Sequence, residues 1–105
     1  YVFVEDVVRA NVVLSETTLA PSSDLDSRAF NVGTQVETTV NQLAEVLMRV
    51  AGSKVSCTYA TERRGELRHS CLSTARLRSL GWEPTHSLEE GLAKTYNHIV
   101  KKEQA

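Results

Sequence analysis

The chain has 105 residues, a formal net charge of -1, and 41% hydrophobic and 24% charged residues. This length predicts one domain over residues 1–105, and the near-zero charge excludes a strong general attraction to nucleic acid or to an anionic membrane. No apolar run approaches the roughly 20 residues that a transmembrane helix needs. The three histidines lack the spacing of metal ligands, so we expect no metal site.

The positions of methionine and cysteine bear on the extent of the chain and on its redox setting. The sequence begins at Tyr1 and its one methionine is Met48, so we expect a piece of a larger protein. Cys57 and Cys71 are too few for a disulfide framework. We expect two free thiols in half-buried strand positions and therefore a reducing, cytoplasmic setting.

The first third of the chain predicts two strands, one helix and a loop. Residues 1–4 are β-branched and aromatic, which predicts a strand. Asp6 is then expected to cap a helix that runs through Leu14. Residues 15–28 are rich in Ser, Thr and Asp, which predicts a surface loop, and residues 29–33 predict a second short strand.

Two later helices carry strong capping signals. Thr39 and Gln42 have the spacing of a capping box, and Gly52 stands where a left-handed C-cap is wanted. Ser87 and Glu90 repeat that spacing before a last helix that extends to the C-terminal lysines. Both helices are therefore predicted from local signals alone.

The segment between these helices predicts two more strands, over residues 55–60 and 69–72. A short helix is expected to start at Ser73 or Thr74 and to stop at Gly81, and Trp82 is expected to pack under the last helix. Strands and helices alternate, so the predicted class is α/β, with a small sheet of about four short strands and about four helices.

The best candidate for ligand binding is the polar stretch over residues 62–69. Its arginines Arg63, Arg64 and Arg68 could offer guanidinium forks to a phosphate or diphosphate. Gly65 would let the backbone approach a ligand, and Glu66 could accept hydrogen bonds from a ribose diol. The alternative interpretation is a solvated turn whose charges largely cancel.

No residues can be nominated for catalysis. The sequence has no Gly-x-Ser-x-Gly, no Cys–His pairing and no Tyr-x-x-x-Lys. The single glycine of the stretch FNVGTQ (residues 30–35) does not make a dinucleotide fingerprint or a P-loop. We therefore expect neither catalytic residues nor cofactor-binding residues in this chain.

Five stretches together resemble the C-terminal, substrate-binding part of extended short-chain dehydrogenase/reductases, the NAD-dependent nucleotide-sugar epimerase and dehydratase family. They span nearly the whole chain in order: YVFVEDVVRA (1–10), FNVGT (30–34), RRGE (63–66), LGWEP (80–84) and SLEEGL (87–92). The resemblance implies a parent whose N-terminal Rossmann half binds NAD(P) and holds the catalytic residues. The fold expected here is then an incomplete piece that lacks this half.

The resemblance also changes the interpretation of the polar stretch. It implies that Arg63 contacts the diphosphate and Glu66 the ribose of a nucleotide-sugar, with Arg68 in the same set. Arg64 and Gln35 depart from the family, where proline and glycine are common at these positions. A further phosphate-binding arginine of the family falls outside the chain, so we expect millimolar affinity or none, about -4 kcal/mol at best.

Three hypotheses about function follow. The first is a truncated, inactive substrate-binding portion of a nucleotide-sugar epimerase or dehydratase. The second is a free-standing, non-catalytic binding or interaction module, with a homodimer expected because apolar residues and strand edges would be exposed. The third is an unrelated small α/β domain that matches by chance.

Overall fold

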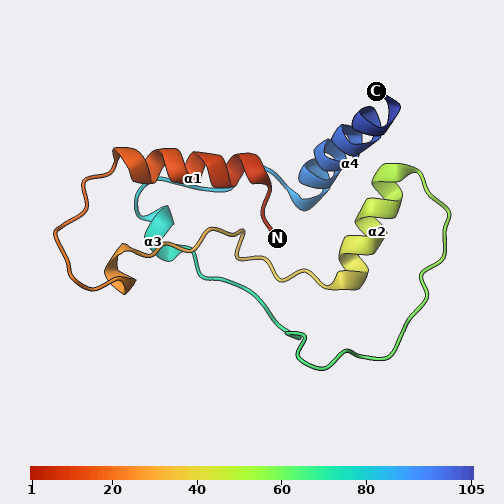
Figure 1. Cartoon of the computed structure of the whole chain (residues 1–105), viewed down its shortest axis with the longest axis horizontal. Helices are drawn as coiled ribbons and strands as arrows, with labels where there is room; N and C mark the ends of the chain where they lie inside the picture. The colour runs from red at the N-terminus through yellow and green to blue at the C-terminus, as the bar shows by residue number, and fades with distance from the viewer.

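The computed structural model describes all residues, 1–105, and contains four α-helices, one short 3-10 helix and no β-strand (Figure 1). In chain order the elements are α1 (Val4–Glu16), the 3-10 helix η1 (Asp26–Arg28), α2 (Val40–Ala51), α3 (Ala75–Arg78) and α4 (Leu88–Gln104). Helices α2 and α4 pack against each other at one end of the molecule. Helices α1 and α3 contribute to one hydrophobic cluster at the other end.

The capping signals in the sequence set the starts of α2 and α4, as predicted. Thr39 Oγ1 accepts from the backbone N–H of Gln42 at 3.1 Å, and Gln42 Oε1 accepts from the backbone N–H of Thr39 at 2.8 Å. Ser87 and Glu90 form the same reciprocal pair at 3.2 and 2.8 Å. Gly52 ends α2 with a φ of 62°, the left-handed conformation that glycine adopts without a steric penalty.

Helix α1 begins earlier than predicted. Its N-cap is Phe3, which makes no side-chain capping bond, so the prediction that Asp6 caps the helix is wrong. Glu5 and Asp6 instead lie in the first helical turn, where carboxylates interact favourably with the positive end of the helix dipole. Residues 1–3 remain extended, and the apolar run at the start of the chain divides between this extended segment and the helix.

The predicted four-stranded sheet is wrong. All four expected strands lack the ladder of backbone hydrogen bonds that defines a strand, because no neighbouring segment pairs with them. Of 43 backbone–backbone bonds, 30 lie within helices and 13 in turns and caps, and none involves residues 54–73. The β-branched residues give these segments a propensity for strand structure, but a strand also needs a neighbouring segment to pair with.

The core is small and lies under α1. Trp82, Leu77 and Ala10 are fully buried, and Val13, Leu14, Phe30 and Val32 pack around them. Gly81, at a φ of 88°, makes the turn that precedes the indole. Trp82 therefore contacts the α1 side of the molecule, and the prediction that it packs under the last helix is wrong.

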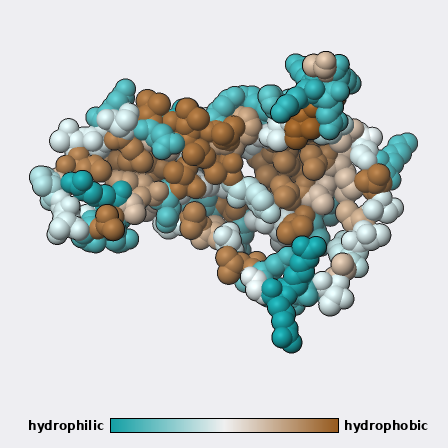
Figure 2. Space-filling model, viewed as in Figure 1, coloured by the Kyte–Doolittle hydropathy of each residue, from teal (hydrophilic) through white to brown (hydrophobic).

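The rest of the molecule is open. Its radius of gyration is 17.3 Å, whereas a compact domain of this length would have about 13 Å. Only 7 of 105 residues are buried, and apolar side chains lie on the surface over α1 and around α2 and α4 (Figure 2). Cys57 and Cys71 are free but exposed, so their predicted half-buried strand positions are wrong. None of the helices combines the length and apolar character needed to cross a bilayer.

Candidate ligand-binding site

The residues that the sequence assigned to a ligand lie on the loop between α2 and α3. Arg63, Glu66 and Arg68 are all exposed there. Arg68 donates from Nε and Nη2 to the two carboxylate oxygens of Glu62 at 3.0 and 2.7 Å. This bond raises the pKa of Arg68. The structure thus pairs Arg68 with Glu62, and no hydrogen bond joins Arg63, Glu66 and Arg68 to one another.

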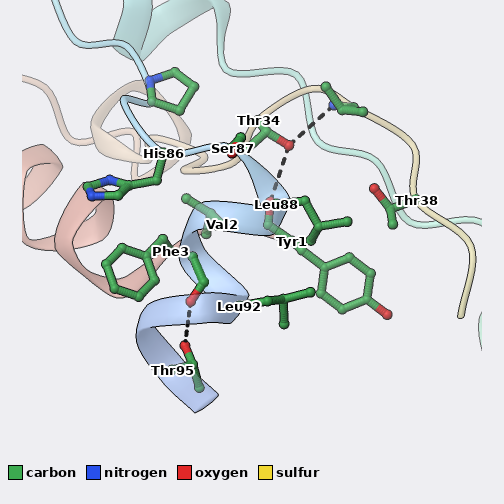
Figure 3. Close-up of a pocket in the computed structure, with 13 residues that line it drawn as sticks. Tyr1, Val2, Phe3, Thr34, Thr38, His86, Ser87, Leu88, Leu92 and Thr95 are labelled. Carbon is green, nitrogen blue, oxygen red and sulfur yellow. Dashed lines mark hydrogen bonds between the residues drawn. The ribbon is translucent and has the colours of Figure 1, made fainter. Parts of the chain in front are cut away.

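A pocket of about 380 Å³ opens elsewhere, between residues 1–3 and the first turns of α4. In Figure 3 the side chains of Tyr1 and Val2 face those of Leu88 and Leu92 across it. The pocket also has hydroxyl-bearing residues, which are Tyr1, Thr34, Thr38, Ser87 and Thr95. No Asp, Glu, Lys or Arg lines it, so its chemistry suits an uncharged group with both apolar and hydroxyl surfaces.

One wall of this pocket is held by a left-handed residue that is not glycine. Gln35 has a φ of 62°, a conformation that costs energy for a residue with a Cβ. Its Oε1 accepts from the backbone N–H of Thr74 at 2.7 Å and from Thr74 Oγ1 at 3.0 Å. Thr34, next to it, donates to the carbonyl oxygen of Tyr1 at 3.2 Å. These bonds fix the turn against both α3 and the start of the chain.

The other two walls are joined by the carboxylate of Asp6, which is fully buried. Its Oδ1 accepts from Arg9 Nη1 at 2.7 Å, from Thr85 Oγ1 at 2.8 Å and from the backbone N–H of Thr85 at 3.1 Å. Its Oδ2 accepts from the backbone N–H of His86 at 3.1 Å and lies 3.2 Å from His86 Nδ1. The segment that enters α4 is therefore tied to the first turn of α1.

This bonding determines the charge of Asp6. Burial by itself raises the pKa of a carboxyl group, but hydrogen bonds from Thr85 and His86 outweigh it and lower the pKa of Asp6 to about 2. The group is therefore ionised at neutral pH. Because it accepts bonds from both Thr85 and His86, it sets how residues 84–95 lie relative to residues 1–3.

No local pattern in the sequence predicts this cluster. Asp6 was expected to cap a helix, and Thr85 and His86 received no role. Thr85 and His86 lie 79 and 80 residues after Asp6, so no local spacing connects them. An acidic residue beside a helix start, such as Asp6, by itself favours a helix terminus more than a buried carboxylate.

Comparisons with known proteins identify relatives of the chain. No family model matches it. A UDP-glucose 4-epimerase of Mycolicibacterium smegmatis is 38% identical over an alignment that covers 99% of this chain and 32% of that protein. A GDP-L-fucose synthase of Escherichia coli is 34% identical over 74 residues, 70% of this chain and 23% of that protein.

A solved structure agrees with these relatives. The UDP-glucose 4-epimerase of Thermotoga maritima, crystallised with UDP-glucose, superposes with a TM-score of 0.83 at 40% identity, over 97% of this chain and 31% of that one. The chain thus spans about a third of the length of these epimerases. Its homologues are UDP-glucose 4-epimerases and GDP-L-fucose synthases, which confirms the resemblance of its motifs to the extended short-chain dehydrogenase/reductase family.

Proposed function

We propose that the chain is the substrate-binding portion of an NAD-dependent nucleotide-sugar epimerase or dehydratase, and that it catalyses no reaction by itself. The observation that carries this proposal is its likeness to the Thermotoga maritima epimerase that was crystallised with UDP-glucose. The absence of a Tyr-x-x-x-Lys motif or any other nominated acid–base pair in these 105 residues supports the second part.

We also propose that residues 1–105 form one domain that lies against a cofactor-binding part of a larger protein. The open shape supports this. The radius of gyration is 17.3 Å, and many apolar side chains are exposed to solvent. Tyr1, Val36 and Val40 are 57%, 62% and 72% exposed, for example. NAD(P) would bind to that other part, so we assign it no contact in this chain.

Within this proposal the loop between α2 and α3 binds the charged part of a nucleotide-sugar. Arg63 and Arg68 contact the diphosphate, since guanidinium forks match paired phosphate oxygens, and Glu66 accepts from the ribose hydroxyls. The side chain of Arg63 makes no bond in the structure, whereas Arg68 must exchange Glu62 for phosphate. That exchange costs little because the pair is exposed.

The pocket between residues 1–3 and α4 suits the uncharged part of such a ligand. Its volume of about 380 Å³ falls within the usual size range of small-molecule sites. Hydroxyl groups of Thr34, Thr38 and Thr95 could bond to a base or sugar, while Leu88 and Leu92 contact its apolar face. Leu92→Trp, which fills the pocket, is expected to weaken binding without removing any charge.

The test is an NMR titration of the ¹⁵N-labelled chain with UDP-glucose. We expect a dissociation constant of about 1 mM, near -4 kcal/mol, with shift changes on the loop. Arg63→Ala should abolish those changes, and the matched control Arg28→Ala, an exposed arginine on η1, should leave them intact. Binding that survives Arg63→Ala unchanged would contradict the assignment of the loop.

A second candidate function is a non-catalytic interaction module that forms a homodimer. The observation in its favour is a row of valines on α1: Val4, Val8 and Val12 are 63%, 55% and 50% exposed. Their spacing of four residues places them on one helix face, opposite the buried Asp6 and Ala10. Such an apolar face can pack against its copy in a second chain.

Light scattering after size exclusion tests the dimer. We expect a mass of twice 11.6 kDa, and we expect Val8→Lys to return the chain to a monomer. Val40→Lys places the same charge on an exposed valine of another helix and should leave the dimer intact. A monomeric wild-type chain at high concentration contradicts the proposal.

We further propose a cytoplasmic location for the chain. Its support is the pair of free, exposed cysteines, because exposed thiols persist in reducing compartments and oxidise elsewhere. Thiol-specific labelling of Cys57 and Cys71 in intact cells, compared with labelling after lysis, is the corresponding test. Labelling before lysis by an impermeant reagent would contradict a cytoplasmic location.

A further inference from the structure

An ion pair connects α1 and α4 beside the pocket. Glu5 lies in the first turn of α1, directly after the extended residues 1–3, and Lys94 lies on α4. Lys94 Nζ is 2.9 Å from Glu5 Oε2. It is the one ion pair between α1 and α4, so it helps to hold these two helices together.

The imidazole of His86 contacts both partners of this ion pair. Its Nε2 lies 3.0 Å from Lys94 Nζ and 3.3 Å from Glu5 Oε2, and its side chain is only 16% exposed. On its other side, Nδ1 lies 3.2 Å from Asp6 Oδ2. Figure 3 shows the ring beside Phe3 at the edge of the pocket, and the two ring centroids are 4.7 Å apart.

These partners determine which ring nitrogen carries the proton when His86 is neutral. The ammonium group of Lys94 carries three protons and no lone pair, so Nε2 must accept and Nδ1 must carry the proton. That proton is donated to Asp6. A neutral His86 therefore completes a continuous set of bonds from Asp6 through the ring to Lys94 and on to Glu5.

We propose that proton binding to His86 exchanges the partner of Glu5. A protonated Nε2 cannot accept from Lys94, and it places a second positive charge 3.0 Å from the ammonium. Nε2–H then donates to Glu5, Lys94 moves into solvent, and α4 loses its ion pair to α1. The contact between α1 and α4 beside the pocket thereby depends on the protonation of His86.

Histidine is the side-chain type whose ordinary pKa falls between about pH 5 and 8. The charged side chains that face His86 come from α1 and α4 and are Glu5, Asp6, Arg9, Lys94 and Glu90. Hydrogen bonds hold the pKa of Asp6 at about 2, and bonds from Ser87 lower the pKa of Glu90. Asp6 and Glu90 therefore stay ionised over that range.

The test follows three NMR signals of the chain from pH 8 to pH 5. They are the ring of His86, the carboxyl carbon of Glu5 and the methyl groups of Leu92 on the pocket wall. We expect one transition with a common midpoint in all three. His86→Gln keeps a donor for Asp6 and an acceptor for Lys94 but cannot be protonated, so it should abolish the transitions of Glu5 and Leu92. His69→Gln, on the exposed loop, should leave both intact.

Lys94→Met separates this proposal from a purely structural role of His86. Without the ammonium no ion pair to α1 exists at any pH, so His86 should still titrate while Leu92 no longer responds. A Leu92 transition that persists in either variant overturns the proposal, as does a wild-type Leu92 signal that stays constant while His86 titrates. Because the test needs no ligand, it is independent of the proposed nucleotide-sugar site.

Discussion

The indole N–H of Trp82 donates to the backbone carbonyl oxygen of Asp6 at 3.0 Å. Asp6 is therefore held twice by the same distant segment, through its backbone by Trp82 and through its carboxylate by Thr85 and His86. Both residues are fully buried. The small core of this open chain thus includes one polar residue that is bonded through both its backbone and its side chain.

Asp6→Asn is expected to destabilise the fold by about 3 kcal/mol. The amide keeps the shape, but its NH₂ group would face donors that now bond to a carboxylate oxygen. Urea unfolding measures the effect. Asp24→Asn, on the exposed loop after α1, should change the free energy of unfolding by less than about 0.5 kcal/mol. An Asp6→Asn effect equally small would show that the cluster contributes little.

Acid should remove the contribution of Asp6 in a defined pH window. The pKa of Asp6 is lowered from 3.8 to about 2 in the folded chain, so its contribution is complete above the unfolded value and is lost as the pH falls through about 2. The shift corresponds to about 2 kcal/mol. The difference in unfolding free energy between wild type and Asp6→Asn should therefore shrink between about pH 4 and pH 2. A constant difference over that range is the contrary result.

Gln35 allows backbone strain to be measured apart from hydrogen bonding. Both Gln35→Ala and Gln35→Gly remove the acceptor that Thr74 uses, but only glycine tolerates a φ of 62° without cost. We expect Gln35→Gly to be more stable than Gln35→Ala by about 1 kcal/mol, measured by thermal or urea unfolding. Equal stabilities would mean that the turn relaxes away from the left-handed conformation once its bonds are gone.

Gly91 is expected to be a packing glycine within α4. A Cβ added there would lie 3.2 Å from Phe3 Cβ, so Gly91→Ala sets better helix propensity against overlap with Phe3. In the wild-type chain we expect no gain in stability. In a Phe3→Gly background, which removes all the overlapping atoms, the same change should stabilise by about 1 kcal/mol. Unfolding of the four variants gives this coupling, and identical effects in both backgrounds would contradict it.

The sequence predicted what depends on neighbouring residues. The capping boxes of Thr39 with Gln42 and of Ser87 with Glu90 are confirmed because donor and acceptor lie three residues apart. Gly52 is confirmed as a left-handed C-cap for the same reason. The family resemblance was also confirmed, because it depends on short stretches of sequence and their order and not on the secondary structure that they form.

Features that depend on distant partners could not be predicted in this way. Residues 55–60 have the composition of a strand, but nothing in their own pattern shows whether another segment will pair with them. Trp82 had to be buried somewhere, and only the tertiary structure places it against α1. Likewise, the roles of Asp6 and His86 arise from contacts across about 80 residues.

The same long separation has a consequence for synthesis on the ribosome. The residues that cover the inner face of α1, Trp82 and Thr85, are translated about 80 residues after that helix. At roughly 5–20 residues per second, this delay is on the order of 4 to 16 seconds. During that time the inner face of the helix lacks its cover, and transiently exposed apolar surface of this kind makes a nascent chain prone to aggregate.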